Sequence, residues 1–377
     1  MKKIVFDIDG VLLSEERYFD VSGLVIWEWL YGKSYMGLPA EQDDFNVSRL
    51  SEGQTAAIRN KIWRGDDLLK WMKSRGINSN CDMVHAYLIT LIWLMAKVYK
   101  ERSGDKLSVS IKEEKDVQKI GQILMGIPVP SSDAVLDRWK SWIPEKIRGN
   151  DVLVCLEEKI SNDIENTDMW TKQFSNFYKM HVNLFHSWYL GDDVFIAKNH
   201  KLPYSGNKEG FLEKEMPLAP AEQILNLFRE LKKHGYEIGI ATGRIREAVE
   251  IPFKKLGWYK EFEPEYIGTA SDAFKASTLF NGMFLDKPHP FIYYCGIWGR
   301  NEKNFASYIN GSKKLKEEDE VYICGDAYSD LLGTKAAGAV FVGVLTGLDG
   351  EKTAEIFEKE GARCIRRITE LSDVLHI

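Results

Sequence analysis

The stretch that decides the fold is KKIVFDIDGVLL, residues 2–13, near the start of the chain. The run Lys3–Ile8 predicts a buried strand, because β-branched and aromatic residues dominate it. Asp7 interrupts this apolar run, and Asp9 and Gly10 end it. A carboxylate inside a buried strand costs free energy unless another group compensates its charge. The sequence therefore predicts that Asp7 has a compensating partner.

Strands and helices alternate from about residue 216 onward. Short apolar runs bounded by turn residues predict strands at 236–243, 282–288, 320–326 and 339–347, with a last strand and helix within 362–375. Helical spacing predicts helices at 217–235, after residue 243 with an early Pro252, and at 328–338. This alternation predicts an α/β fold, a doubly wound and mostly parallel sheet with helices on both faces.

Residues from about 15 to 215 lack this alternation and show helical periods instead, as in 24–35, 66–76 and 113–126. We expect residues 1–14 and 216–377 to form the α/β domain, and 15–215 a mainly helical domain inserted after the first strand. Short strands are expected at 106–111 and 193–198, and a linker at 205–220. Nine of the eleven tryptophans lie in the insertion: Trp27, Trp29, Trp63, Trp71, Trp93, Trp139, Trp142, Trp170 and Trp188.

Composition narrows the class of protein. The net charge of −6 and the pI near 5.8 argue mildly against nucleic-acid and anionic-membrane partners. Five cysteines without metal-site spacing suggest reduced thiols and a cytoplasmic location. The expected strand at residue 3 leaves no room for a signal peptide. The apolar run 83–99 is 17 residues long and contains His85 and Lys97, so we expect a buried helix, with Asp82 as N-cap, rather than a membrane span.

Polar residues stand at the ends of four expected strands, where ligands bind in open α/β sheets. Carboxylates suit Mg²⁺, a lysine neutralises phosphate, and a hydroxyl with glycine-turn amides hydrogen-bonds phosphate oxygens. Taken singly, each group has a structural alternative: a turn, a loop or a helix cap. The four sets are Asp7 with Asp9; Thr242 with Gly243 and Arg244; Lys287; and Asp326 with Asp330.

Four sequence pieces, in this order, resemble the haloacid dehalogenase superfamily of aspartate-nucleophile phosphotransferases. They are DIDGVL, ATGR, DKP and GDAYSDLLGTKAAG, the last followed by VGVLTG. The resemblance covers residues 1 to about 14 and about 216 to 377, and implies a Rossmann-like core. It identifies the insertion as a helical lid, the type 1 cap. At about 200 residues this lid is larger than expected and matches no known cap pattern, so the substrate stays open.

The resemblance implies a catalytic role for four residues. Asp7 would attack phosphorus and form an aspartyl-phosphate. Asp9 would act as general acid and base. Thr242 would bind the phosphoryl group, and Lys287 would offset the charge of both nucleophile and phosphate. The partner predicted for Asp7 is thus a metal together with Lys287.

The resemblance also implies metal and phosphate ligands. Asp7, Asp326 and the backbone carbonyl of Asp9 would bind Mg²⁺, and Asp330 would either ligate it or support the site. The amide of Gly243 would bind phosphoryl oxygens, as would Lys287. Arg244 is open between a phosphate contact and a cap on the next helix.

Within the superfamily that the sequence resembles, an aspartate at the position of Asp9 implies phosphate-ester hydrolysis or phosphate transfer between sugar hydroxyls. We therefore expect a Mg²⁺-dependent phosphatase that acts on a small phosphorylated metabolite. The alternatives are a sugar-phosphate phosphomutase using the same two aspartates, and a non-catalytic binding module on the same fold. The sequence predicts no oligomeric state.

Overall fold

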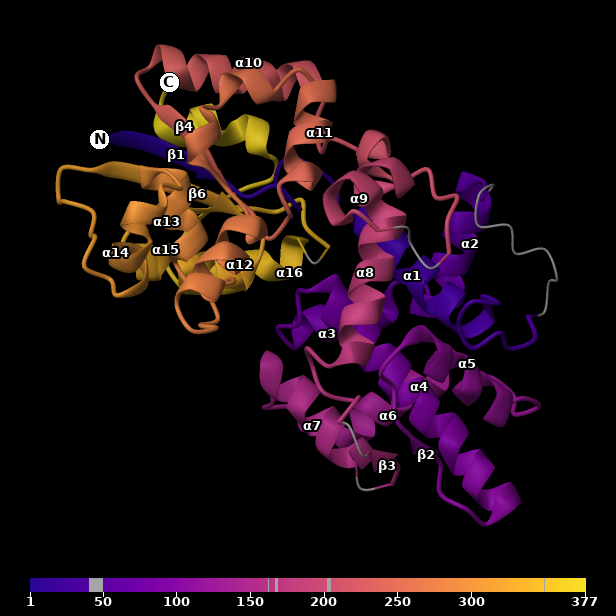
Figure 1. The fold of residues 1–377 in the computed structure, drawn as a ribbon. Helices are drawn as coiled ribbons and strands as arrows, with labels where there is room; N and C mark the ends of the chain where they lie inside the picture. The colour runs from indigo at the N-terminus through magenta and orange to yellow at the C-terminus, as the bar shows by residue number, and fades with distance from the viewer. Residues whose placement is uncertain (41–49, 162, 167–168, 202–204, 349) are drawn as a thin grey trace. The chain divides into compact units, whose positions relative to one another are not determined.

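The protein is described here by a computed structural model that places residues 1–40, 50–161, 163–166, 169–201, 205–348 and 350–377 (Figure 1). The chain forms two compact units. The core unit comprises Met1–Glu15 and Leu212–Ile377, and the helical unit comprises Glu16–Phe211. The chain thus leaves the core unit soon after its first strand and returns about 200 residues later.

The core unit is built on a sheet of six parallel strands in the order β5-β4-β1-β6-β7-β8. This confirms the expected α/β fold with a parallel sheet. The first strand is central, since Phe6 pairs with Ile240 of β4 on one side and Cys324 of β6 on the other. The strands are β1 (Lys2–Phe6), β4 (Glu237–Ala241), β5 (Ile267–Gly268), β6 (Glu320–Gly325), β7 (Val340–Val344) and β8 (Arg363–Ile365).

Helices cover both faces of the sheet, and successive side chains of β1 point to opposite faces. Ile4 and Phe6 belong to a buried cluster with Phe228 of α10, and Val5 belongs to a second cluster with Phe291 of α13. Figure 1 shows α10 and α11 on one side of the sheet, and α12, α13, α14 and α15 on the other. The core helices are α10 (Ala221–Lys233), α11 (Glu247–Lys255), α12 (Ala270–Leu279), α13 (Phe291–Trp298), α14 (Phe305–Ile309), α15 (Tyr328–Ala337), α16 (Gly350–Lys359) and α17 (Leu371–Leu375). Short 3-10 turns are Leu212–Lys214, Tyr259–Glu261, Pro264–Tyr266, Glu302–Asn304 and Ile368–Glu370.

The prediction of a strand at 282–288 is wrong. These residues form a loop between α12 and α13, and two of their apolar side chains, Met283 and Phe284, are 45% and 63% exposed. The strand that pairs with the outer side of β4 is β5, and its two residues are too few to give a strand pattern in the sequence. Lys287 therefore lies in a loop rather than at a strand end.

The helical unit has its own core, in which α1 packs against α2, α4 and α8. Trp29 of α1 is fully buried and contacts Phe177 of α8, with ring centroids 5.0 Å apart. Of the strand expected at 106–111, Ser108–Val109 forms β2, which pairs with Glu165–Asn166 (β3). The prediction of a strand at 193–198 is wrong, because these residues lie in α9. The helices are α1 (Glu16–Tyr31), α2 (Glu52–Trp63), α3 (Asp67–Ser74), α4 (Asn80–Ser103), α5 (Glu114–Ile123), α6 (Ser132–Trp142), α7 (Asn150–Ser161), α8 (Asn176–Leu190) and α9 (Asp192–Asn199).

Helix α4 is, among the described residues, the one helix long and apolar enough to cross a membrane. Its most apolar window is 72% buried inside the protein, as expected for a core helix. The expected N-cap, Asp82, is wrong: Ser79 caps the helix, and its hydroxyl accepts from the Asp82 amide at 3.3 Å. The Asp82 carboxylate instead accepts from the Tyr178 hydroxyl at 2.7 Å.

Phe228 ties α10 to the sheet, and its truncation tests this packing. Its ring lies 5.4 Å from that of Phe6 and 5.0 Å from that of Phe262, and it is fully buried. We expect Phe228→Ala to lower the free energy of unfolding by about 3–5 kcal/mol through lost burial and a cavity. Urea unfolding measures this change. The matched control is Phe274→Ala, at a side chain 76% exposed, which should change stability by less than about 0.5 kcal/mol; equal effects would contradict the packing.

Candidate active site

Three parallel strands bring their carboxyl ends to one edge of the sheet. Asp7 follows β1, Thr242 follows β4, and Asp326 follows β6. The Asp7 amide donates to the Cys324 carbonyl at 2.9 Å, and the Thr242 amide to the Gly268 carbonyl at 3.1 Å, so the backbone pairing continues past the strand ends. These polar side chains therefore start from adjacent, rigid backbone positions.

Asp7 has the compensating partner that its place in the sequence requires. Its side chain is only 7% exposed, and its Oδ2 lies 2.8 Å from Nζ of Lys287. The same ammonium lies 2.7 Å from Oδ1 of Asp330, at the start of α15. Lys287 thus bridges two buried carboxylates, although it comes from a loop rather than a strand.

The pKa values of Asp7 and Lys287 depend on each other's charge. Burial opposes the charged form of Lys287, but the carboxylates of Asp330 and Asp7 outweigh it and raise the lysine pKa above its ordinary value. Burial raises the pKa of Asp7 to about 7, Lys287 opposes this shift, and the charges of Asp330 and Asp9 add to it. One lysine therefore compensates this acidic edge only partly, and a bound cation would favour the ionised form of Asp7.

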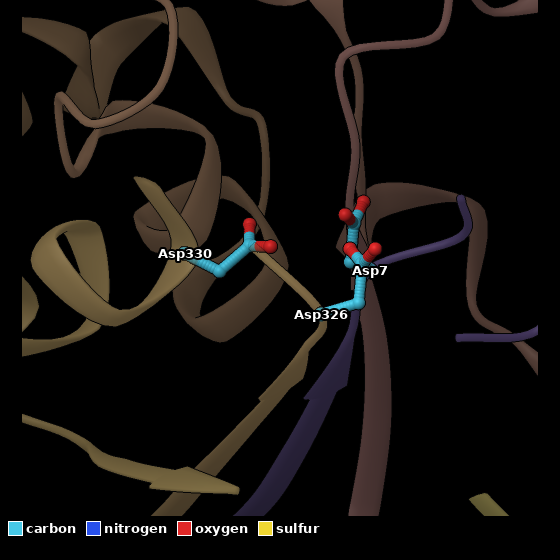
Figure 2. Close-up of side chains that lie close together, drawn as sticks. All are labelled: Asp7, Asp326 and Asp330. Atoms are coloured by element: carbon cyan, nitrogen blue, oxygen red, sulfur yellow. The ribbon is translucent and has the colours of Figure 1, made fainter. Parts of the chain in front are cut away.

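The carboxylates fit a divalent cation. Asp7, Asp326 and Asp330 each offer an oxygen, and these oxygens lie within 4.8 Å of one another. Figure 2 shows the three side chains turned toward a common space. Oδ1 of Asp7 is buried and has no hydrogen-bond partner among the described residues. A buried carboxylate oxygen without a partner is costly, and a hard cation would satisfy it.

Asp330 differs from the other two acids. It is fully buried, and its Oδ1 accepts from the Tyr293 hydroxyl at 2.7 Å as well as from Lys287. Its Oδ2 accepts from the Ala327 amide at 3.1 Å. Since both oxygens already have donors, Asp330 is suited to holding Lys287 in place more than to ligating a metal.

Two glycines make room for Asp326. A Cβ atom at Gly10 or at Gly347 would overlap Oδ2 of Asp326. Gly10 also has a φ of +70°, a backbone conformation that favours glycine. The hydroxyl of Thr346 donates to the Gly10 carbonyl at 2.5 Å and so joins the loop after β7 to the loop after β1.

The loop after β4 offers an open backbone and a buried hydroxyl. Thr242 is fully buried, and its Oγ1 accepts from the Arg244 amide at 3.2 Å. Gly243 is exposed, and a Cβ atom there would meet nothing within 4 Å, so a ligand can approach its backbone. The Arg244 guanidinium does not point to open solvent: it lies 2.6 Å from Asp9 and 3.0 Å from Glu215.

Sequence reasoning missed three contributors to this site. Tyr293 lies in an apolar helix that reads as core, and only the fold shows its hydroxyl on Asp330. Glu215 lies in the returning linker, where nothing in the sequence separates it from other charged residues. Gly347 is the last residue of VGVLTG, and only the fold shows that this glycine lies against Asp326.

Comparisons with known proteins give relatives but no family model that matches. A structural genomics target solved by X-ray crystallography (Northeast Structural Genomics Consortium) is 32% identical, with a TM-score of 0.79 over 100% of this chain and 98% of the other. A conserved haloacid dehalogenase-like protein of unknown function from Agrobacterium tumefaciens is 13% identical, with a TM-score of 0.40 over 100% of this chain and 98% of the other.

Among curated proteins, the pyrophosphatase PpaX of Bacillus pumilus is 25% identical over 150 residues, 40% of this chain and 56% of that protein. The corresponding protein of Bacillus velezensis is 25% identical over 156 residues, 41% of this chain and 58% of that protein. The chain thus spans little more than half the length of the curated relatives it matches.

Removing one carboxylate tests whether this edge binds a cation. We expect Mg²⁺ at about 100 times its dissociation constant to raise the free energy of unfolding by about 2.7 kcal/mol. Asp326→Asn should lose most of this gain, because it removes an anionic ligand oxygen. Thermal unfolding with and without Mg²⁺ measures it.

The matched control for this measurement is Asp137→Asn, at an exposed position of α6, which should keep the full gain. A wild-type protein that is indifferent to Mg²⁺, or an Asp326→Asn variant stabilised as strongly as the wild type, would contradict the cation site.

Proposed function

The chain belongs to the haloacid dehalogenase superfamily, and we propose that it is a Mg²⁺-dependent phosphatase. It hydrolyses a small soluble phosphomonoester through a covalent aspartyl-phosphate on Asp7. The observation that carries the proposal is the convergence at one sheet edge of Asp7, Asp326 and Asp330, with Lys287 bound to Asp7 at 2.8 Å. The names of the curated relatives, both pyrophosphatases, support phosphoryl transfer to water as the reaction type.

In the first step, a carboxylate oxygen of Asp7 attacks phosphorus as the bond to the leaving oxygen breaks. Asp7 is fixed for this role because its amide is bonded to Cys324 and its Oδ2 to Lys287. Lys287 is cationic in the site, so it attracts the anionic phosphoryl group and limits its repulsion from Asp7. Asp330 and Tyr293 hold the lysine at this position.

Asp9 acts as the general acid and base. In its protonated form it gives a proton to the leaving oxygen, and the resulting carboxylate later takes a proton from the attacking water. Water then cleaves the aspartyl-phosphate, releasing inorganic phosphate and restoring Asp7. The Asp9 side chain is 26% exposed, so it can reach both a leaving group and water.

The remaining groups bind the phosphoryl oxygens and the cation. The amide of Gly243, where a Cβ atom would meet nothing within 4 Å, and the hydroxyl of Thr242 would donate hydrogen bonds to phosphate. Asp7, Asp326 and the Asp9 carbonyl would hold Mg²⁺, with Asp330 behind them. When bound, Mg²⁺ would neutralise negative charge on the acids and the phosphoryl group. We place the reaction in the cytoplasm, on the unpatterned cysteines alone.

Replacing the nucleophile tests the covalent mechanism. We expect Asp7→Asn to lower magnesium-dependent hydrolysis of p-nitrophenyl phosphate by at least about 10³-fold, because the amide is a poor nucleophile. Absorbance of released p-nitrophenolate measures the rate, and circular dichroism reports folding. The Asp137→Asn control should keep the wild-type rate. A folded Asp7→Asn variant with near-normal hydrolysis would rule out the nucleophile.

A panel of substrates separates hydrolysis from transfer. We expect release of inorganic phosphate from at least one phosphomonoester, since Asp9 can activate water. Sugar phosphates, nucleoside monophosphates and inorganic pyrophosphate should be included, the last because of the relatives' names. A phosphomutase would instead interconvert two sugar-phosphate isomers with little phosphate release, and a binding module would do neither.

A further inference from the structure

Arg244 is the most deeply enclosed charge near the candidate site that the proposed mechanism does not use. It directly follows Thr242 and Gly243 in the loop after β4, yet its side chain is only 1% exposed. A guanidinium at this depth needs anionic or carbonyl partners around it. Its partners show what it does.

One edge of the guanidinium holds Asp9. Nη2 lies 2.6 Å from Oδ1 of Asp9, and Nε lies 3.1 Å and 3.2 Å from its two carboxylate oxygens. A planar guanidinium bound through two nitrogens fixes a carboxylate in both position and orientation. Asp9 is part exposed and without this pair would be free to change rotamer.

The other edge is anchored by Glu215. Nη1 lies 3.0 Å from Oε1 of Glu215, and Nη2 lies 3.3 Å from Oε2. The Glu215 side chain is only 2% exposed. Its backbone neighbourhood is fixed as well, since the Ser14 amide donates to the Met216 carbonyl at 2.8 Å.

The hydrogen-bond inventory argues against a phosphate contact for Arg244. An arginine has five N–H donors. Nε serves Asp9, Nη2 serves Asp9 and Glu215, and Nη1 serves Glu215 and the Ala248 carbonyl at 3.3 Å. Every donor therefore has an acceptor within the protein, and a phosphate oxygen would have to displace a buried carboxylate.

We propose that Arg244 and Glu215 are positioning residues that fix the carboxylate of Asp9 for proton transfer. The inference rests on the proposed function, in which Asp9 is the general acid and base. Arg244 acts through Asp9 and does not touch the phosphoryl group. The carboxylate stays at a set distance from the leaving oxygen because the guanidinium is itself held by Glu215 and α11.

This role has a signature in leaving-group dependence. p-Nitrophenolate departs readily without a proton, whereas phenolate resembles the tyrosine side chain, with a pKa of about 10, and depends more on the general acid. The ratio of kcat/KM for p-nitrophenyl phosphate to that for phenyl phosphate therefore reports proton delivery. Values of kcat/KM are used because they include leaving-group departure even when the second step limits kcat.

We expect Arg244→Lys to lower kcat/KM for phenyl phosphate by about 10²-fold, since small misplacements of a reacting group cost this much. The loss for p-nitrophenyl phosphate should be at least about tenfold smaller. Lysine keeps the positive charge but cannot bind the Asp9 carboxylate through two nitrogens, so this variant distinguishes an effect of carboxylate position from an effect of charge. Glu215→Gln should shift the ratio in the same direction and by less, because Asp9 keeps its direct partner.

Two controls keep the test interpretable. Arg246→Lys changes an arginine two residues on, which pairs with Asp272, and should leave the ratio unchanged. Because Arg244→Lys could unfold the site, circular dichroism and the Glu215→Gln variant provide independent readouts. A folded Arg244→Lys variant with equal losses on both substrates, or with none, would overturn the inference.

A phosphate-binding role for Arg244 would give a different result. KM for both substrates and the inhibition constant of inorganic phosphate would then rise together, with an unchanged ratio. Failure of the proposed function is distinguishable from both outcomes, because it would appear as hydrolysis that survives Asp7→Asn, or as no hydrolysis by the wild-type protein.

Discussion

The constraint on which the site depends is the single ammonium of Lys287 between two buried carboxylates. Asp7 follows the end of β1 and Asp330 lies in the first turn of α15, and the Lys287 ammonium is within 2.8 Å of both carboxylates. Burial raises the pKa of Asp7, and Lys287 opposes this shift. The contact between Lys287 and Asp7 joins residues 280 positions apart in sequence (287 minus 7), so it forms only when the loop between α12 and α13 packs beside the end of β1. The compensation of these carboxylate charges therefore depends on the packing of the core unit.

Asp7 and Asp9 are two residues apart and have opposite environments. Asp7 is buried against Lys287 and faces Asp326 and Asp330, where charge is costly and a cation is favoured. Asp9 is part exposed and lies on the guanidinium of Arg244. Two carboxylates with different surroundings can take different roles, one as nucleophile and one as proton carrier. Strand alternation does not explain this difference, because residues two apart on a strand point to the same side. Both residues follow the end of β1 at Phe6, and the chain turns directly after Asp9 at Gly10, which has a φ of +70°.

Strands β1, β4, β6 and β7 could be predicted from sequence, because each is an apolar run of five or six residues bounded by turn residues. The place of Asp7, Thr242 and Asp326 follows from those strands. The apolar residues before Lys287 predict a strand, whereas the structure has a loop in which Met283 and Phe284 are exposed. The sequence of residues 193–198 predicts a strand, but α9 forms there, since a short apolar run is compatible with both a strand and a helix.

Partners across the fold could not be predicted. Nothing in the sequence relates Glu215 to Arg244, or Tyr293 to Asp330, because these pairs depend on how a returning segment and a helix pack against the sheet. For Arg244 the sequence left phosphate binding and helix capping open, and its actual partners are two carboxylates and a carbonyl. Side-chain direction, which the local pattern does not encode at loop positions, decides such contacts.

The most direct measurement is anomalous scattering from Mn²⁺ in crystals of the protein, with Mn²⁺ in place of Mg²⁺. We predict one peak at the carboxyl ends of β1 and β6, at the Mg²⁺–oxygen distance of about 2.0–2.1 Å from a carboxylate oxygen of Asp7 and one of Asp326. A peak elsewhere, or a cation bound to Asp326 while Asp7 faces away, would contradict it.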